Sequence, residues 1–323
     1  MPHASPSGST LPPSSCDPSM STLDHAKADC ETEALVSASI QHIRDQVRRR
    51  NQWHRSGIVV GRPDLRTLLS DKGAGIARQI NLHNAFCAAV SPHDWKAHVF
   101  DLTTDVLQSG LINYDHAAGV LRMQRLPPPD LAGHPVLHQN RQMHEDLADI
   151  ATFRSRFHVM TNGALTGLTS RDIIVSGGSV LACLTTAPSQ ATEYVRSDID
   201  LFVTARTTSS ARALVGEIET VLNKNIPSFK TDFRVFRSPD VITFAPSNHA
   251  RAHGYRKIQV ITALNSTPCD IVAHFDLDPV CVFYNLERVF ITPRAMRAFW
   301  TGFSYVTNAI RTVSAARILN RFT

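Results

Sequence analysis

Residues 173–203, IIVSGGSVLACLTTAPSQATEYVRSDIDLFV, decide the fold that the sequence predicts. An apolar, strand-like run ends in SGGS (176–179) and passes into a short helical segment. After a polar loop, a second apolar run opens with SDID (197–200). Its two carboxylates lie two residues apart, so on a strand they project to the same face of the sheet. Such like charges repel unless a cation lies between them, and Mg²⁺ is typically held by a few carboxylates and substrate phosphates.

The turn at 176–179 supplies the complementary half of a nucleotide site. Gly177, Gly178 and Ser179 place backbone N–H groups and a hydroxyl at the start of a helix, which suits an anion. A glycine turn alone, or an Asp-x-Asp strand alone, is common in α/β proteins, but the two in this order indicate nucleotide chemistry. A later run, FDLD (275–278), adds Asp276 and Asp278 within a predicted strand region over 271–284.

The rest of this half alternates strand-like and helical patterns, which predicts an α/β (α+β) fold: a mixed sheet with covering helices. Apolar residues at helical spacing predict a helix over 143–160 that covers the sheet. Proline near the start of the last helical stretch is a tolerated position. The other predicted elements are strands at 172–176, 199–204, 233–236, 241–244 and 257–263, and helices from 179, over 209–222 and over 292–321.

The N-terminal part has a different composition. Residues 1–30 are rich in Ser, Pro and Thr, so we expect a disordered tail. Residues 31–139 are predicted to be mainly helical, with one helix over 31–53 and another from Pro92 to about residue 109. Consecutive prolines at 127–129 indicate a linker. We therefore place the sheet-containing domain at 140–323.

Composition excludes several classes of protein. The 323 residues carry a net charge of +5, which permits an anionic partner without requiring one. Six cysteines form no CxxC pair, so neither a disulfide framework nor a zinc site is indicated, and several lie in apolar runs as small core residues. The N-terminus lacks the apolar stretch of a signal peptide, and no segment approaches the ~20 apolar residues of a membrane span. The sequence predicts an intracellular protein, cytoplasmic or nuclear, with no membrane partner.

With these motifs in place, residues 150–323 resemble the DNA polymerase β-type nucleotidyltransferase superfamily. The shared pattern is a Gly-Gly or Gly-Ser turn, a short helix, an Asp-x-Asp strand and a third acid on a later strand. The resemblance is closer to a subgroup of fungal and large-DNA-virus proteins that often carry ankyrin repeats. It rests on FRSRFHVMTNGALTGL (153–168), 173–184, 197–203, KIQVI (257–261), 275–278 and VFITPR (289–294).

The resemblance implies transfer of a nucleoside monophosphate from an NTP to an acceptor, which could be RNA, a nucleotide or a protein. Asp198 and Asp200 correspond to the family's acid pair, and Asp276 is favoured over Asp278 as the third acid. These acids would hold Mg²⁺ or Mn²⁺. Gly177, Gly178 and Ser179 would hold the triphosphate.

Three alternatives remain open from the sequence. Arg256 and Lys257 either contact the triphosphate or are simply solvated. The loop over 185–194 makes the motif longer than the family pattern, so the chain could instead be a catalytically inactive module that binds nucleotide or protein. In that case the N-terminal helices would form the surface for a protein partner. The pair His249 and His253 has metal-ligand spacing, but we expect a surface turn there.

Overall fold

In the computed structural model, the described residues are 62–70, 80, 83, 94–124, 134–135, 144–185, 197–264 and 266–304. All of them belong to one compact unit, Gly57–Thr323. The predicted tail at 1–30 and helix at 31–53 lie outside the described residues. The predicted linker at 127–129 does as well, so the boundary proposed there stays a prediction.

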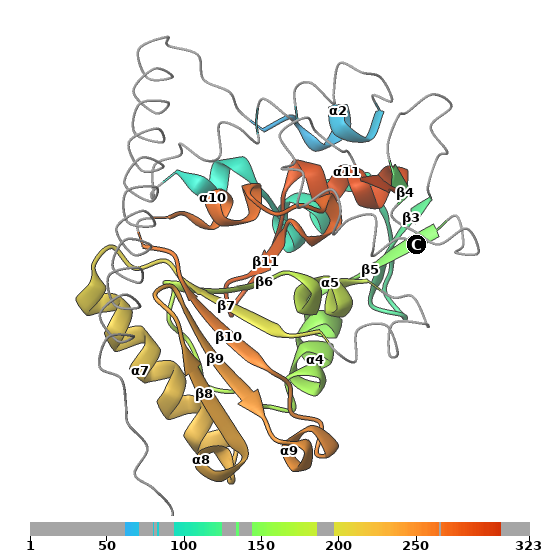
Figure 1. Ribbon diagram of the computed structural model, residues 1–323. Coiled ribbons are helices and arrows are strands. Elements are labelled where there is room, and N and C mark those ends of the chain that lie inside the picture. Colours follow the sequence, from blue (N-terminus) through green and yellow to red (C-terminus); the bar gives the residue numbers. More distant parts are fainter. Residues whose placement is uncertain are drawn as a thin grey trace, which may run out of the picture. The chain divides into compact units, whose positions relative to one another are not determined.

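An eight-stranded mixed sheet forms the centre of this unit (Figure 1). Neighbouring strands run antiparallel except β7 and β10, which are parallel. This arrangement confirms the predicted fold class. In spatial order the strands are β1 (Phe100–Asp101), β12 (Val289–Ile291), β11 (Val282–Tyr284), β6 (Ile173–Ser176), β7 (Ile199–Val203), β10 (Ile258–Thr262), β9 (Val241–Pro246) and β8 (Phe233–Arg237).

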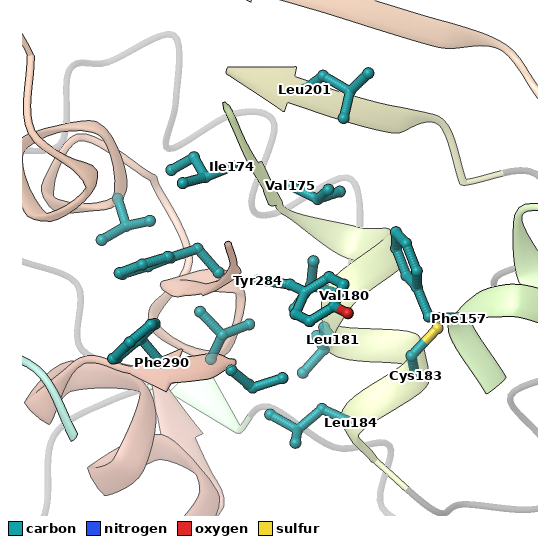
Figure 2. Packing of buried hydrophobic residues seen from close by; sticks show 14 of the residues in the cluster. Phe157, Ile174, Val175, Val180, Leu181, Cys183, Leu184, Leu201, Tyr284 and Phe290 are labelled. Atoms are coloured by element: carbon teal, nitrogen blue, oxygen red, sulfur yellow. The ribbon is translucent and has the colours of Figure 1, made fainter. Parts of the chain in front are cut away.

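Four helices cover one face of the sheet: α4 (Ile150–Met160), α5 (Gly178–Leu184), α7 (Thr208–Asn225) and α8 (Phe229–Asp232). Val175 and Leu201 are register partners that share this face, and they belong to the same buried cluster as Val180 of α5 (Figure 2). Phe157 of α4 meets the ring of Tyr284 at 5.2 Å. Apolar burial of this kind, about 25 cal/mol per Å², stabilises the helices on the sheet.

The opposite face is covered near β11 and β12. Trp95, in the 3₁₀ helix η1 (Trp95–His98), packs edge-on against Phe283 and Phe290. Helix α10 (Pro268–Ala273) begins at the capping residue Thr267, whose hydroxyl accepts from the N–H of Asp270. Because this cap and Pro268 begin a helix, the strand region predicted over 271–284 is wrong for most of its length. Only β11 is a strand there, and η4 (Asp278–Val280) is a 3₁₀ turn.

Two predicted helices differ in extent from those observed. The helix predicted over 143–160 begins only at Ile150, because Asp149 caps it by accepting from the N–H of Thr152. The preceding residues form β5 (His144–Ala148), which joins a second sheet with β2 (Asn113–Asp115) and β3 (Val120–Gln124). The last predicted helix begins as expected, capped by Thr292, but α11 (Pro293–Thr301) ends before Gly302, whose φ is +76°.

The helix predicted over 92–109 is broken into short pieces. They are η1, β1, the π-helix η2 (Leu102–Val106) and the 3₁₀ helix η3 (Leu107–Ser109). The break lies at Asp101, whose carboxylate accepts from the N–H groups of Thr103 and Thr104 and so starts a new helical turn. The remaining short elements are α2 (Leu65–Ser70), α9 (Asn248–Ala252) and a two-stranded pair, β4 (His134–Pro135) with β13 (Phe303–Ser304).

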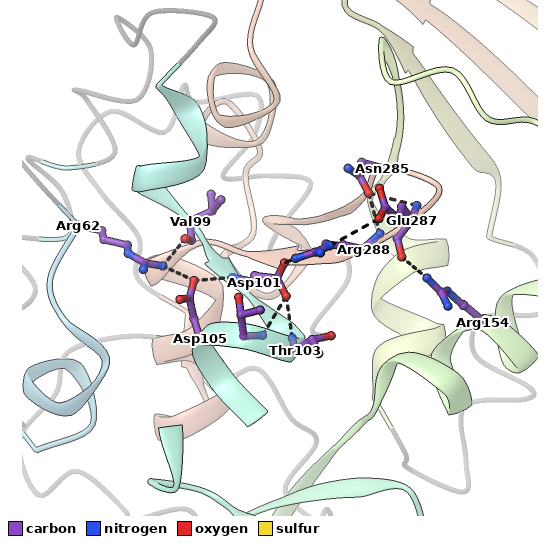
Figure 3. Close-up of polar contacts among 10 residues, drawn as sticks. Arg62, Val99, Asp101, Thr103, Asp105, Arg154, Asn285, Glu287 and Arg288 are labelled. Carbon is purple, nitrogen blue, oxygen red and sulfur yellow. Dashed lines mark hydrogen bonds and ion pairs between the residues drawn. The ribbon is translucent and has the colours of Figure 1, made fainter. Parts of the chain in front are cut away.

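A polar network ties Arg62 and residues 99–105 to the turn between β11 and β12 (Figure 3). Asp101 is central, because its carboxylate also pairs with Arg288 at 3.0 Å. Arg62 pairs with Asp105 at 2.9 Å and also donates to the carbonyl of Val99. Asp101 and Arg288 therefore anchor edge strand β1 on β12.

Two further expectations concern the whole unit. Three cysteines, Cys183, Cys269 and Cys281, are buried free thiols, as predicted for core residues. Burial raises the pKa of Cys183 and of Cys281 to about 12, so neither is reactive at neutral pH. Among the described helices, none has the length and apolar content that crossing a membrane requires.

Candidate functional site

The site is centred on Asp200, which lies in β7 between two neighbouring strands. Its register partner on β6 is Ser176, and its partner on parallel β10 is Gln259. Ile199, Leu201 and Val203 are buried, whereas Asp200 and Phe202 are half-buried. This alternation turns the Asp200 side chain to the face opposite α4 and α7.

The glycine turn packs directly against this carboxylate. Gly177 has φ +91° and ψ −153°, a conformation that only glycine adopts readily. A Cβ placed on Gly177 would lie 3.3 Å from Oδ2 of Asp200, and one on Gly178 would lie 3.4 Å from Oγ of Ser197. The fold therefore brings the two halves of the motif into contact, although the predicted loop between them lies outside the described residues.

Two serines flank the turn and behave differently. Ser176 donates through Oγ to the carbonyl of Val282 at 2.6 Å, so its hydroxyl ties β6 to β11. Ser179 is fully buried, and its Oγ has no hydrogen-bond partner in the described part of the chain. A buried hydroxyl without a partner costs about 1–3 kcal/mol, which is typical of a group that a ligand or water completes.

The electrostatics of the acid pair are unfavourable without a cation. Burial, and after it the charge of Asp198, raise the pKa of Asp200 from 3.8 to about 6 against the opposing effect of Lys257. Lys257 places Nζ 2.6 Å from Oδ2 of Asp198. The ammonium therefore partly neutralises the pair, but Asp200 remains under-compensated.

The two predicted basic residues have separate roles. Lys257 is not simply solvated, because it pairs with Asp198; its predicted contact with a triphosphate stays a prediction. Arg256 donates through Nε to the carbonyl of Met160 at 3.0 Å and through Nη1 to that of Ser197 at 3.3 Å. Because Ser197 immediately precedes Asp198, Arg256 fixes the start of the Asp-x-Asp segment against the end of α4.

The two candidate third acids, Asp276 and Asp278, do not lie on a strand as predicted. Asp278 is buried and pairs with Arg294, with Nη2 at 2.6 Å and Nε at 2.7 Å from Oδ1. Asp276 is half-buried in the preceding bend. Its neighbour Phe275 contacts Phe202 of β7, with ring centroids 5.9 Å apart. Across the described ranges, no group of three or more His, Cys, Asp or Glu side chains could hold a metal ion.

Sequence reasoning missed Gln259. Gln259 lies on β10 directly beside Asp200. A carboxylate at this position would be the third acid next to the Asp198–Asp200 pair. The only local signal is its place in KIQVI, two residues after Lys257, because residues two apart share a face. The surface turn expected at the histidine pair is found at His253, which is exposed and follows α9. His249 instead lies within α9, with its Nδ1 3.0 Å from Oδ2 of Asp232.

Comparison with known proteins found a family model that matches part of the chain. A family model described as Gad2, Gabija anti-defense 2 family protein, matches residues 151–301. That segment is less than half of the chain, and it includes the glycine turn, the acid pair and Lys257. No curated protein and no solved structure matches the chain.

Proposed function

We propose that this chain transfers a nucleoside monophosphate from an NTP to an acceptor. One observation carries the proposal: the glycine turn at Gly177 lies in contact with Asp200, beside a second carboxylate, Asp198. A turn whose backbone admits a phosphate, next to a pair of carboxylates, is what binding of a metal–triphosphate requires.

The residues present are suited to a divalent cation. Asp198 and Asp200 supply two oxygen ligands of the kind that Mg²⁺ and Mn²⁺ prefer, and a cation there would offset the burial and the Asp198 charge that raise the pKa of Asp200. When bound, such an ion polarises the phosphoryl group and stabilises the leaving oxygen. Asp276 would complete the set only if the bend that holds it moves toward β7.

The chain's own residues supply the remaining interactions. Gly177 and Gly178 present backbone N–H groups without a side chain in the way. The hydroxyl of Ser179, which has no hydrogen-bond partner among the described residues, can donate to a phosphate oxygen. Lys257 is half-exposed and can exchange its contact with Asp198 for the triphosphate once a cation occupies the acid pair. In this proposal the acceptor's reacting hydroxyl faces Asp200.

The test is NTP consumption with Mg²⁺ or Mn²⁺ by the full chain. The double variant Asp198→Ala/Asp200→Ala should lose turnover by at least 100-fold, whereas Asp172→Ala, an exposed acid at the far end of β6, should not. Absence of turnover with all four NTPs, together with absence of metal-dependent NTP binding, would exclude both activity and nucleotide recognition.

A second candidate is a catalytically inactive module that binds nucleotide or protein. It is favoured by the Lys257–Asp198 ion pair, the position of Gln259 beside Asp200, and the engagement of Asp278 by Arg294. Lys257→Met separates the candidates. If Lys257 permanently replaces the metal, the variant should bind Mn²⁺ where the wild type does not. If Lys257 serves the triphosphate, wild type already binds Mn²⁺ and the variant raises KM for the NTP.

The family match suggests a biological setting. We propose that the activity of the Gly177–Asp200 site is directed against the Gabija defense, which is what the matched family's description names. Cells carrying that defense would be compared with and without the chain. The defense should weaken with wild type and stay intact with Asp198→Ala/Asp200→Ala. Equal weakening by both forms would assign the effect to binding rather than to transfer.

A further inference from the structure

The face of the sheet that carries Asp200 continues to its edge strand, β8. Across the strands, Asp200 pairs with Gln259, Gln259 with Thr243, and Thr243 with Phe236. Because register partners in adjacent strands share a face, these four side chains form one row. Gln259 and Thr243 are half-buried, so the row is accessible between its two ends.

The outer end of this row carries an aromatic and a cationic side chain. Phe236 is 57% exposed, an unusual position for a large apolar residue. Arg234 is two residues away, so it shares this face, and it is exposed and makes no ion pair with the residues that the structure describes. In contrast, Arg237 lies on the other face, where it pairs with Glu219 of α7 at 3.0 Å.

The spacing indicates an extended ligand. Three strand-to-strand steps of about 4.8 Å separate Asp200 from Phe236 by about 14 Å. A ligand that contacts both the acid pair and Phe236 must therefore span this distance, which extends beyond the reacting triphosphate of the NTP. Exposed aromatic rings next to cationic side chains are the platform on which single-stranded nucleic acids stack their bases and place their phosphates.

We propose that the acceptor is a single-stranded nucleic acid that crosses this face, stacking a base on Phe236 and placing a phosphate at Arg234. The inference rests on the proposed function, because it names the acceptor of the same site. A peptide that added a strand to the edge of β8 would bind through backbone groups and would not require Phe236 or Arg234.

The experiment measures binding of labelled single-stranded RNA and DNA, about 12 nucleotides long, to the full chain without NTP or metal. Phe236→Ala should weaken binding by about 5- to 150-fold. Arg234→Gln should weaken it and reduce the steepness of its salt dependence by about 0.7 in the log–log slope. The matched controls are Val235→Ala and Arg237→Gln, which alter the same strand on the face toward α7.

The outcomes are separable from those of the proposed function. Selective loss in Phe236→Ala and Arg234→Gln supports the inference, and the RNA and DNA arms identify the sugar. Lack of oligonucleotide binding, or equal loss in the controls, overturns it. Selective oligonucleotide binding without NTP turnover would support the nucleic-acid surface and refute the proposed transferase activity. Transfer onto a mononucleotide acceptor, at a rate that Phe236→Ala does not change, would refute the nucleic-acid acceptor and support the proposed transferase activity. Unchanged circular dichroism shows that each variant is folded.

Discussion

Asp200→Asn should stabilise the protein at neutral pH while it removes one ligand of the proposed cation. In the folded chain, burial and the charge of Asp198 raise the pKa of Asp200 from 3.8 to about 6. That difference corresponds to about 3 kcal/mol of ionisation free energy that folding must supply when the carboxylate is charged. Because Asp200 is half-buried and the amide must still find partners, we expect Asn to recover about 1–3 kcal/mol.

The sign of the pH dependence follows from where the proton is held. Between about pH 4 and pH 6 the folded state holds the Asp200 proton more often than the unfolded chain. The contribution of Asp200 to the wild-type free energy of unfolding therefore falls as pH rises through this window and is constant above it. The advantage of Asp200→Asn is then full above about pH 6 and vanishes below about pH 4.

The assay is urea unfolding of wild type and Asp200→Asn at about pH 4 and about pH 7.5, supported by melting temperatures, where about 2–10 °C is expected at the higher pH. Asp172→Asn changes an exposed acid in the turn just before β6; it is the control and should change stability by less than about 0.5 kcal/mol. Saturating Mg²⁺ should narrow the gap by stabilising only the wild type. If Asp200→Asn is no more stable than wild type at about pH 7.5, the electrostatic argument is wrong.

Three further predictions concern the supports of the site. Gly177→Ala should lower the free energy of unfolding by about 1–3 kcal/mol because of its positive φ, whereas Gly216→Ala, with open space around its Cβ in α7, should raise it by about 0.5–1 kcal/mol; thermal unfolding measures both. Asp278→Asn should cost about 3–5 kcal/mol in urea unfolding by leaving the buried Arg294 without its counter-charge, and Asp278→Leu with Arg294→Met should recover most of it; equal stability of the single variant and wild type would contradict this. Arg256→Met should cost about 1–3 kcal/mol in the same measurement through its two lost carbonyl bonds, and an unchanged midpoint would show that they contribute nothing.

The sequence predicted the parts of the site that depend on neighbouring residues. The turn at Gly177, the start of α5 and the alternation around Asp200 are local, since they follow from glycine conformation and from the two-residue period of a strand. Local capping also set the start of α11 correctly at Thr292.

The parts that the sequence did not predict depend on pairing between distant segments. Gln259 stands beside Asp200 because β10 runs parallel to β7, a register that its place two residues after Lys257 does not by itself encode. The alternating acids Asp276 and Asp278 looked like a strand end. Instead, the cap at Thr267 begins a helix and Arg294, far along the chain, holds Asp278 in a 3₁₀ turn.

The balance of charge at the acid pair bears on the choice between an active and an inactive site. Nζ of Lys257 lies 2.6 Å from Oδ2 of Asp198. In a permanently inactive site, this ammonium would take the place of the metal ion. Asp200 keeps a pKa near 6 mainly because it is buried, with the charge of Asp198 adding to the shift and Lys257 opposing it, so a cation at the pair would favour the charged carboxylate. Within the described residues, the buried Ser179 hydroxyl has no hydrogen-bond partner, and it lies at the turn that contacts the same Asp200. Both groups gain from a ligand that brings positive charge and phosphate oxygens together, and a metal–triphosphate supplies both, which favours nucleotide binding over a purely structural ion pair.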